Sequence, residues 1–382
     1  MLSNQSFIAR PLPTILFGKG ASLRLSKQIR SLGATSALVV TDKNLNASGV
    51  LNPMLDAIRQ AGVRVDVFDG VEPNPTDKNV EAGAARLREL GDACCVLAVG
   101  GGSSMDCGKS IALMAANEGT VESLQGSATL LGAKAPVIAV PTTAGTGSET
   151  NNACVITNTR LVRKTYVMHP SITPAFAVLD PELSVGLPAY PTATCGFDVL
   201  THAMEAFVSA RASAYSDALA LEAIRKVTAH LRDAVEDGAD LEARSQMLLA
   251  SAMAAMAFNV AGLGAAHGTG HALSARLHAA HGQSLATMLP AVMEYNMANR
   301  ADRFAEVARV LAPSGPATAA AAIDAVARLR SDIGIDRSIK DLGAQDELLP
   351  TLVEDAMADP VNVTNPRALD LAALESIYRS AW

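Results

Sequence analysis

The chain has 382 residues, of which 49% are hydrophobic and 18% are charged, and its formal net charge is −7. This length favours two domains or one large one, and the negative net charge argues against nucleic acid and anionic membranes as partners, because both select basic patches. The five cysteines show no CxxC and no disulfide-like spacing, and the N-terminal residues lack the features of a signal peptide, so we expect a cytoplasmic protein with reduced thiols.

Strand-like and helix-like segments alternate over residues 1–186. Continuous apolar runs predict strands that are buried on both faces, and one run with alternating side chains predicts a further strand. In chain order these runs are at residues 37–41, 63–68, 94–99 and 137–140. Strands that alternate with helices indicate βαβ units, so we predict an α/β domain with a parallel sheet.

Asp42 follows the first of these predicted strands. A carboxylate at this place can accept hydrogen bonds from the 2′-hydroxyl of an adenosine ribose and would repel a 2′-phosphate, which favours NAD over NADP. An ordinary loop or helix-capping aspartate explains the residue equally well.

Two glycine-rich segments directly follow predicted strands. Residues 100–109 read GGGSSMDCGK, and residues 141–149 read PTTAGTGSE. Free backbone N–H groups and the N-terminus of a following helix favour a bound phosphate, and an open α/β sheet binds its ligand at the carboxyl ends of its strands. Neither segment matches GxGxxG or the P-loop pattern, and either one alone could be a tight turn. Together they favour a nucleotide-binding cleft.

Strand signals nearly vanish after residue 187, and segments rich in alanine, leucine and methionine predict an all-helical domain over residues 187–382. The expected helices are at residues 191–208, 214–235, 241–261, 283–297, 300–312, 316–332, 346–357 and 368–380. Residues 247–266 carry no charge over 20 positions, which is long enough to cross a membrane. Because this segment is mostly alanine and methionine and leads into a group of histidines, we interpret it as a buried helix.

Four of the seven histidines lie in one short stretch: His267, His271, His278 and His281. The first two are four positions apart, so a helix places both imidazoles on one face. Upstream, Asp198 and His202 have the same spacing. This mixture of nitrogen and oxygen ligands suits Fe(II) or Zn(II) and is too rich in nitrogen for Mg or Ca. One histidine pair in an alanine-rich helix is explained as well by packing, whereas the two fragments together favour a metal site.

These segments together resemble the iron-containing alcohol dehydrogenases, a metal-dependent family that includes lactaldehyde reductase and 1,3-propanediol dehydrogenase. The resemblance covers essentially the whole chain, including its last residues, NPRALDLAALESIYRSAW. Its motifs are PNPT, GGGSxxDxxK, PTTAGTGSE, GxDxLTHAxE and GLGxAHGxxHxLxxxxxxxHG, at residues 73–76, 100–109, 141–149, 196–205 and 262–282. The resemblance implies a dehydroquinate synthase-like architecture. A Rossmann-like, dinucleotide-binding α/β domain over residues 1–186 would precede an all-helical, metal-binding domain over residues 187–382.

The resemblance also implies a role for individual residues. The metal ligands, matched position by position, would be Asp198, His202, His267 and His281. His271 would lie in the site without binding the metal, and we expect this imidazole to relay a proton. Cofactor contacts would be made by Asp42, Asn74, Gly101, Gly102, Ser103, Thr142, Thr143, Thr146 and Lys164. The chain departs from its relatives at Asn362, where some have cysteine, and at residues 148–151, which read SETN where SEVT is commoner.

The implied activity is reversible hydride transfer between NAD(H) and a small primary alcohol or aldehyde, with Fe(II), or alternatively Zn(II), in a cytoplasmic homodimer. Enzymes of the same architecture are the nearest alternatives: a zinc glycerol dehydrogenase-like enzyme or a dehydroquinate synthase-like lyase. The lyase would need several basic residues for its substrate, and these are scarce around the motifs. A catalytically inactive nucleotide-binding sensor and a metal-dependent hydrolase stay open as alternatives of other classes.

Overall fold

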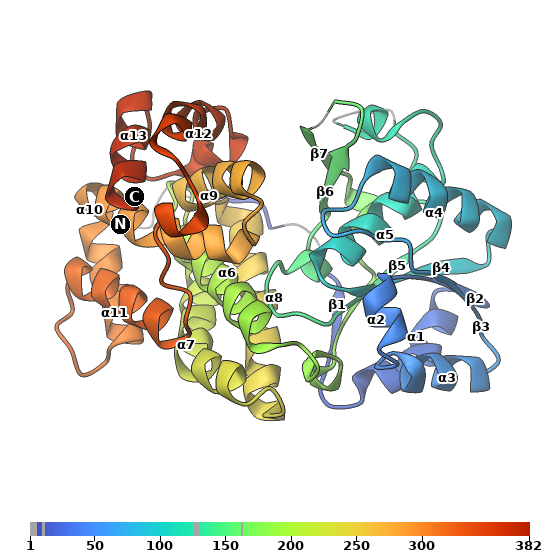
Figure 1. Cartoon of the computed structure of the whole chain (residues 1–382). Helices are drawn as coiled ribbons and strands as arrows, with labels where there is room; N and C mark the ends of the chain where they lie inside the picture. The colour runs from blue at the N-terminus through green and yellow to red at the C-terminus, as the bar shows by residue number, and fades with distance from the viewer. Residues whose placement is uncertain (1–5, 10–11, 126–129, 162) are drawn as a thin grey trace. The chain divides into compact units, whose positions relative to one another are not determined.

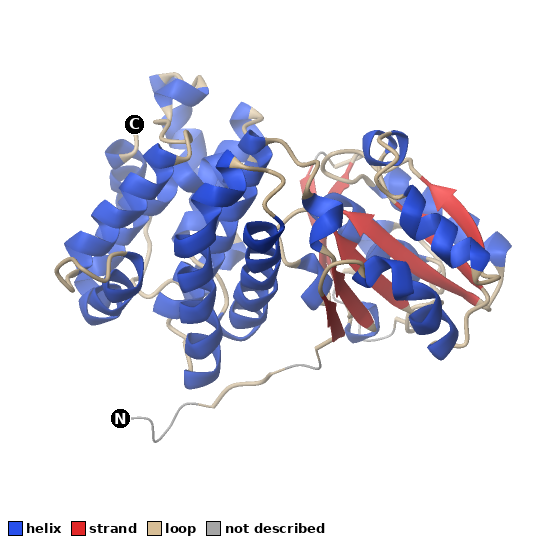
Figure 2. Cartoon of the chain, turned by 90° about the horizontal axis from the view of Figure 1, so that it is seen from below, coloured by secondary structure: helices blue, strands red, loops and turns tan. Residues whose placement is uncertain are grey.

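The computed structural model describes residues 6–9, 12–125, 130–161 and 163–382. Contacts divide the chain into two compact units, which differ in secondary structure (Figures 1 and 2). The sheet unit consists of Pro11–Thr143 and Gly147–Gly186, and the helical unit consists of Met1–Arg10, Ala144–Thr146 and Leu187–Trp382.

The sheet unit is built on a six-stranded parallel sheet with the strand order β1-β8-β5-β4-β2-β3. These strands are β1 (Thr14–Phe17), β2 (Ser36–Val40), β3 (Arg64–Phe68), β4 (Cys94–Gly100), β5 (Val137–Pro141) and β8 (Phe176–Leu179). The predictions of strands β2, β3, β4 and β5 and of a parallel sheet are therefore confirmed. A separate antiparallel pair joins β6 (Ala153–Asn158) to β7 (Arg163–Met168).

Helices cover both faces of the six-stranded sheet, which explains why its central strands are continuously apolar. Leu38 and Val40 of β2 pack on one face with helices α4 (Asp77–Leu90) and α5 (Gly102–Met114). The alternate residues Ala37 and Val39 pack on the other face with α1 (Leu25–Ser31) and α3 (Asn52–Gln60). A short helix, α2 (Lys43–Ala47), follows β2.

The helical unit has a core of alanine, leucine, methionine and phenylalanine side chains. Its α-helices are α6 (Ala189–Val208), α7 (Ala214–Glu236), α8 (Leu241–Ala261), α9 (Ala265–Leu277), α10 (His281–Leu311), α11 (Ala319–Asp332), α12 (Leu349–Met357) and α13 (Leu371–Ser380). Several of them begin at a polar residue whose side chain accepts a hydrogen bond from a free backbone N–H, such as Ser213 before α7 and Asp240 before α8.

The helix predicted at residues 241–261 is confirmed as α8, but the interpretation of the uncharged segment 247–266 as one buried helix was wrong. The segment is divided because α8 ends at Ala261, and the φ of 79° at the following Gly262 suits glycine and few other residues. The two helices predicted at 283–297 and 300–312 are confirmed as the two parts of α10, which are separated by a kink at Arg300, where the backbone is not helical. Within the described residues no single helix is long and apolar enough to cross a membrane; α8 and α9 meet these criteria only jointly, across a bend of 110°.

Candidate active site

Helix α6 presents Asp198 and His202 on one face, one turn apart. Asp198 is 3% exposed and His202 is 5% exposed, and the Nε2 atom of His202 lies 3.4 Å from Oδ1 of Asp198. The same helix packs closely on α7 through a glycine. A Cβ atom added to Gly196 would come within 2.2 Å of Leu231 on α7.

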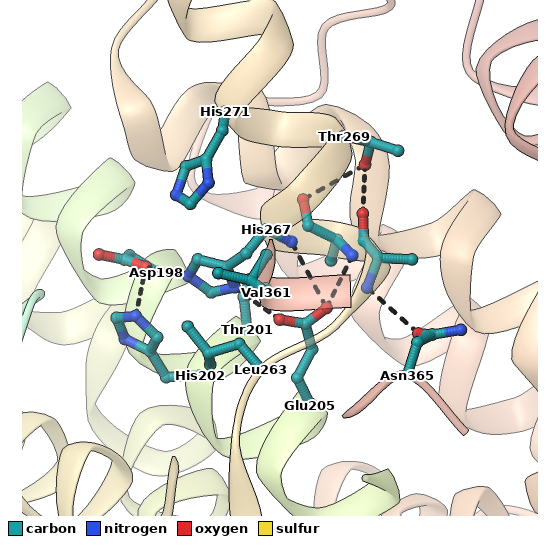
Figure 3. Close-up of polar contacts among 12 residues, drawn as sticks. Asp198, Thr201, His202, Glu205, Leu263, His267, Thr269, His271, Val361 and Asn365 are labelled. Carbon is teal, nitrogen blue, oxygen red and sulfur yellow. Dashed lines mark hydrogen bonds and ion pairs between the residues drawn. The ribbon is translucent and has the colours of Figure 1, made fainter. Parts of the chain in front are cut away.

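Two further imidazoles, from α9 and α10, approach the same carboxylate oxygen. Figure 3 shows His267 of α9 beside Asp198 and His202 of α6. Nε2 of His267 lies 3.5 Å and Nε2 of His281 lies 3.7 Å from Oδ1 of Asp198. The ligand atoms of Asp198, His267 and His281 all lie within 4.8 Å of one another. Oδ1 of Asp198 and Nε2 of His267 are buried and form no hydrogen bond within the described part of the chain. Three imidazole nitrogens that converge on one carboxylate oxygen fit a divalent transition metal.

Burial and charge interactions favour the ligand form of three residues in this group. Burial would raise the pKa of Asp198, but the His202, His281 and His267 imidazoles together lower it, so the carboxylate is ionised. Burial lowers the pKa of His202 to about 4 and that of His281 to about 3, which keeps both imidazoles neutral. For His267 burial is outweighed by the carboxylates of Glu205 and Asp198, which raise its pKa to about 9.

Glu205 is a site residue to which the sequence analysis gave no role. Its Oε2 lies 2.6 Å from Nδ1 of His267, and its Oε1 accepts a hydrogen bond of 2.7 Å from the backbone N–H of Ala266. A carboxylate on Nδ1 holds the ring so that Nε2 is directed at a metal. The sequence could have indicated this role, because Glu205 follows Asp198 by seven positions. This spacing is about two helical turns and places both carboxylates on the same face of a helix.

His271 lies beside the group formed by Asp198 and the three imidazoles. Its ring stacks on His281, with 5.3 Å between ring centroids, and its Nδ1 is 2.7 Å from Oδ2 of Asp359. The structure thus brings a further polar group, Asp359, to the predicted site. His278 is the residue at which α9 ends, and its backbone is left-handed, with a φ of 53°.

A segment that contains the short helix η8 (Pro360–Thr364) packs against α9 through glycines. A Cβ atom added to Gly262 would come within 2.4 Å of Thr364, and one added to Gly268 would come within 2.2 Å of Asn362. Asn362, where the chain departs from its relatives, donates through Nδ2 to the carbonyl of Ala356 at 2.6 Å. Its Oδ1 is buried and has no hydrogen-bond partner in the parts of the chain that the structure describes.

Among the predicted cofactor contacts, the structure brings together Asn74, Ser103 and Lys164. The backbone N–H of Asn74 donates to Oγ of Ser103 at 3.3 Å, and Nζ of Lys164 donates to Oδ1 of Asn74 at 2.8 Å and to Oγ1 of Thr157 at 3.2 Å. Asn74 has a left-handed φ of 58°, and burial lowers the pKa of Lys164. This cluster adjoins the N-terminus of α5, where Gly101 precedes Gly102 and Ser103.

The two glycine-rich segments meet where their strands end. The backbone N–H of Thr142 donates to the carbonyl of Gly100 at 3.0 Å, and a Cβ atom added to Gly101 would contact Thr143 at 3.5 Å. Thr146 does not belong to the sheet unit, because contacts assign residues 144–146 to the helical unit. There the carbonyl of Gly145 accepts a hydrogen bond of 3.2 Å from Ser251.

Asp42 caps helix α2. Its Oδ1 accepts a hydrogen bond of 3.0 Å from the backbone N–H of Leu45. This is the helix-capping role that the sequence left open, and the contact with a cofactor ribose stays a prediction.

Comparisons with known proteins agree with this geometry. Residues 13–181 match the family model of iron-containing alcohol dehydrogenases, and residues 192–382 match the C-terminal model of the same family. The 1,3-propanediol dehydrogenase of Citrobacter freundii is 40% identical over 374 residues, which cover 96% of each chain. The NAD-dependent methanol dehydrogenase of Bacillus methanolicus is 36% identical, over 97% of this chain and 98% of that relative. A crystal structure of 1,3-propanediol oxidoreductase has a TM-score of 0.94 and 39% identity, with 99% of this chain and 100% of the other covered. The chain therefore belongs to the iron-containing alcohol dehydrogenase family and is an oxidoreductase of alcohols and aldehydes.

Proposed function

We propose that the protein catalyses reversible hydride transfer between NAD(H) and a small primary alcohol or aldehyde, with the aid of a divalent metal. The observation that carries this proposal is the convergence of three imidazole Nε2 atoms on the buried Oδ1 of Asp198, in a chain of this family. The relatives' names support the substrate size and the cofactor, since they refer to 1,3-propanediol, to methanol and to NAD.

The metal would be held by Asp198, His202, His267 and His281. We propose Fe(II), with Zn(II) as the alternative, because a set of nitrogen and oxygen ligands accepts both ions. When bound, such an ion supplies Lewis-acid polarisation of a substrate oxygen. The chain contributes one carboxylate and three imidazoles. Without an ion His202 and His281 are neutral, and His267 would release its proton when an ion binds. The charge of a divalent ion would then be only partly neutralised, and it would still attract a negatively charged substrate oxygen. Glu205 orients His267 for this task.

The sheet unit would bind NAD(H), whose nicotinamide supplies or accepts the hydride. Its phosphates would lie at the backbone N–H groups of Gly101, Gly102 and Ser103, where the N-terminus of α5 favours negative charge. Asn74, Thr142, Thr143, Thr146 and Lys164 would make further contacts, and Asp42 would select NAD over NADP.

His271 would relay the proton that the reaction releases or consumes, and Asp359 would hold the imidazole in place through Nδ1.

We expect His271→Ala to lower kcat by on the order of 10²-fold, the usual contribution of a positioned acid or base, while the metal content stays near that of wild type. Turnover kinetics and elemental analysis of the same samples check this. His278→Asn is the matched control, because asparagine tolerates the left-handed backbone there and should leave both quantities unchanged. Loss of metal from His271→Ala would show instead that this histidine is a ligand.

We also propose a cytoplasmic homodimer. Its support is the N-terminal part of the chain, where β1 is an edge strand of the sheet and several apolar side chains are exposed: Phe7, Ile8, Leu12, Ile15 and Phe17. An unpaired apolar edge tends to be covered by another chain. Light scattering during size-exclusion chromatography should give the mass of two chains, and the mass of one would contradict the proposal.

The activity is tested with anaerobic, Fe(II)-loaded protein and NADH against lactaldehyde, glycolaldehyde, 3-hydroxypropanal, butanal and succinic semialdehyde. A Zn(II)-loaded sample and an NADPH series run in parallel. We expect turnover with Fe(II) and NADH, and the aldehyde with the highest kcat/KM defines the substrate class. No turnover by protein that binds both metal and NADH would favour the lyase or the inactive sensor.

A further inference from the structure

Helix α5 carries a fully buried lysine that has no part in the function proposed above. Lys109 is 0% exposed, and its Nζ donates to the carbonyl of Ser148 at 2.9 Å, to Oδ1 of Asn151 at 2.9 Å and to the carbonyl of Ala153 at 2.7 Å. A buried ammonium group is costly unless it is fully hydrogen-bonded and its charge is balanced. Retention of a lysine here therefore calls for a specific explanation.

Asp106 balances that charge from the preceding turn of the same helix. Its Oδ1 lies 3.5 Å from Nζ of Lys109 and accepts a hydrogen bond from Oγ of Ser148. Its Oδ2 accepts a hydrogen bond of 2.9 Å from the backbone N–H of Val155. Asp106 and Lys109 thus both bind residues 148–155: the carboxylate of Asp106 accepts hydrogen bonds from them, and the ammonium group of Lys109 donates hydrogen bonds to them.

This stretch connects three parts of the candidate cofactor site. It includes the last residues of the glycine-rich segment at residues 141–149, and it leads into β6, which pairs Thr157 with Lys164 of β7. The other glycine-rich segment forms the N-terminus of α5 itself, one to two turns before Asp106 and Lys109. The two side chains therefore fix the first phosphate-binding segment relative to the second and relative to Lys164.

We propose that Lys109 and Asp106 are positioning residues for the dinucleotide: they hold the two glycine-rich segments and the β6–β7 hairpin in the arrangement that binds NAD(H), without touching the cofactor themselves. This proposal rests on the proposed function of the sheet unit. It assigns the lysine and aspartate of GGGSxxDxxK to the geometry of the cofactor site, and the glycines and serine of the same motif to the cofactor.

The experiment titrates full-length, Zn(II)-loaded protein with NADH and follows the fluorescence of the cofactor. Lys109→Met replaces the ammonium group by an apolar side chain of similar length. We expect its Kd for NADH to rise by about tenfold or more, because displacement by about 1 Å in a binding constellation costs on the order of 10²-fold. Metal content, measured on the same sample, should equal that of wild type. Lys134→Met is the matched control. Lys134 belongs to the same unit and pairs with the exposed Asp92, so the Kd of this variant for NADH should equal that of wild type.

The titration separates positioning from mere stabilisation of the fold. A residue that only stabilised the unit would lower the Tm and the fraction of active protein, and would leave the Kd of the folded molecules unchanged. Folded Lys109→Met that binds NADH within twofold of wild type would therefore overturn the proposal, while absence of NADH binding by wild type would overturn the proposed function instead.

A second variant covers the case in which Lys109→Met does not fold. Asn151→Leu removes one acceptor of the ammonium group and keeps the two carbonyls and Asp106. A severalfold rise in the Kd for NADH supports the proposal, and an unchanged Kd in this folded variant contradicts it.

Discussion

Replacement of His267 by alanine is expected to remove the metal and the activity together. The imidazole is buried, and its Nε2 points at Oδ1 of Asp198 from 3.5 Å. Without this imidazole the ion would lose a nitrogen ligand and would no longer bind. The reaction would then lose its Lewis acid, whose stabilisation of charge in the transition state is worth several kcal/mol. Because each 1.36 kcal/mol corresponds to a tenfold change in rate, we expect kcat/KM to fall by about 10³-fold or more. Elemental analysis and NADH-coupled turnover of the same preparation measure both effects.

Two further variants make this result interpretable. His230→Ala changes a histidine on α7 outside the site, and it should keep both metal and activity. His281→Ala removes a proposed ligand whose side chain is 37% exposed, so it leaves less buried polar surface unpaired than His267→Ala does. It should lose the metal even if His267→Ala proves too unstable to purify. An active variant without metal at either position would rule out the mechanism.

The second large effect is expected at Glu205. In Glu205→Gln the side-chain oxygen can still accept from the backbone N–H of Ala266, but the charged partner of Nδ1 of His267 is lost. Replacement of a group that orients a metal-bound histidine typically weakens metal binding by about 10- to 100-fold. We expect a change of this size in the Kd for Zn(II), measured by competition with a chromogenic chelator.

The control for this experiment is Glu222→Gln. Glu222 lies on α7 and pairs with Arg225 and Lys226 at the surface, so its loss should leave Zn(II) affinity unchanged. If Glu205→Gln binds Zn(II) as tightly as wild type, the carboxylate serves only the packing of α6 on α9.

The parts of this site that follow from sequence are those with a local period. Asp198 and His202 are four positions apart on one helix, so the pattern alone placed them on a common face. The strands of the central sheet could also be predicted from the sequence, because burial on both faces requires continuous apolar runs. The family resemblance then added His281, whose distance from the other ligands no local pattern defines.

The contacts that escaped prediction join residues far apart in the chain. Glu205 reaches His267 over 62 positions, and Asp359 reaches His271 over 88 positions. The spacing from Asp198 placed Glu205 on the same helical face, but the local sequence does not identify the distant partner of either acidic residue. The strands β1 and β8 were missed for a related reason, since each has only four residues and they pair with each other across the length of the unit.

Gly262, which follows α8, and Gly268, which lies in α9, limit where substitutions can be made to change the substrate specificity of this enzyme. Where Gly262 and Gly268 meet Thr364 and Asn362, no room exists for even a methyl group on the helical side. Diversity has to be introduced on the opposite side, at Val361 and at Val363, which is 74% exposed, and not at Asn362, whose side chain fills the space beside Gly268. A mutant library that randomises those two positions and leaves the glycines unchanged is expected to retain folded members. One that randomises the glycines is expected to retain fewer, because even a Cβ atom there comes within 2.4 Å of Thr364 or 2.2 Å of Asn362.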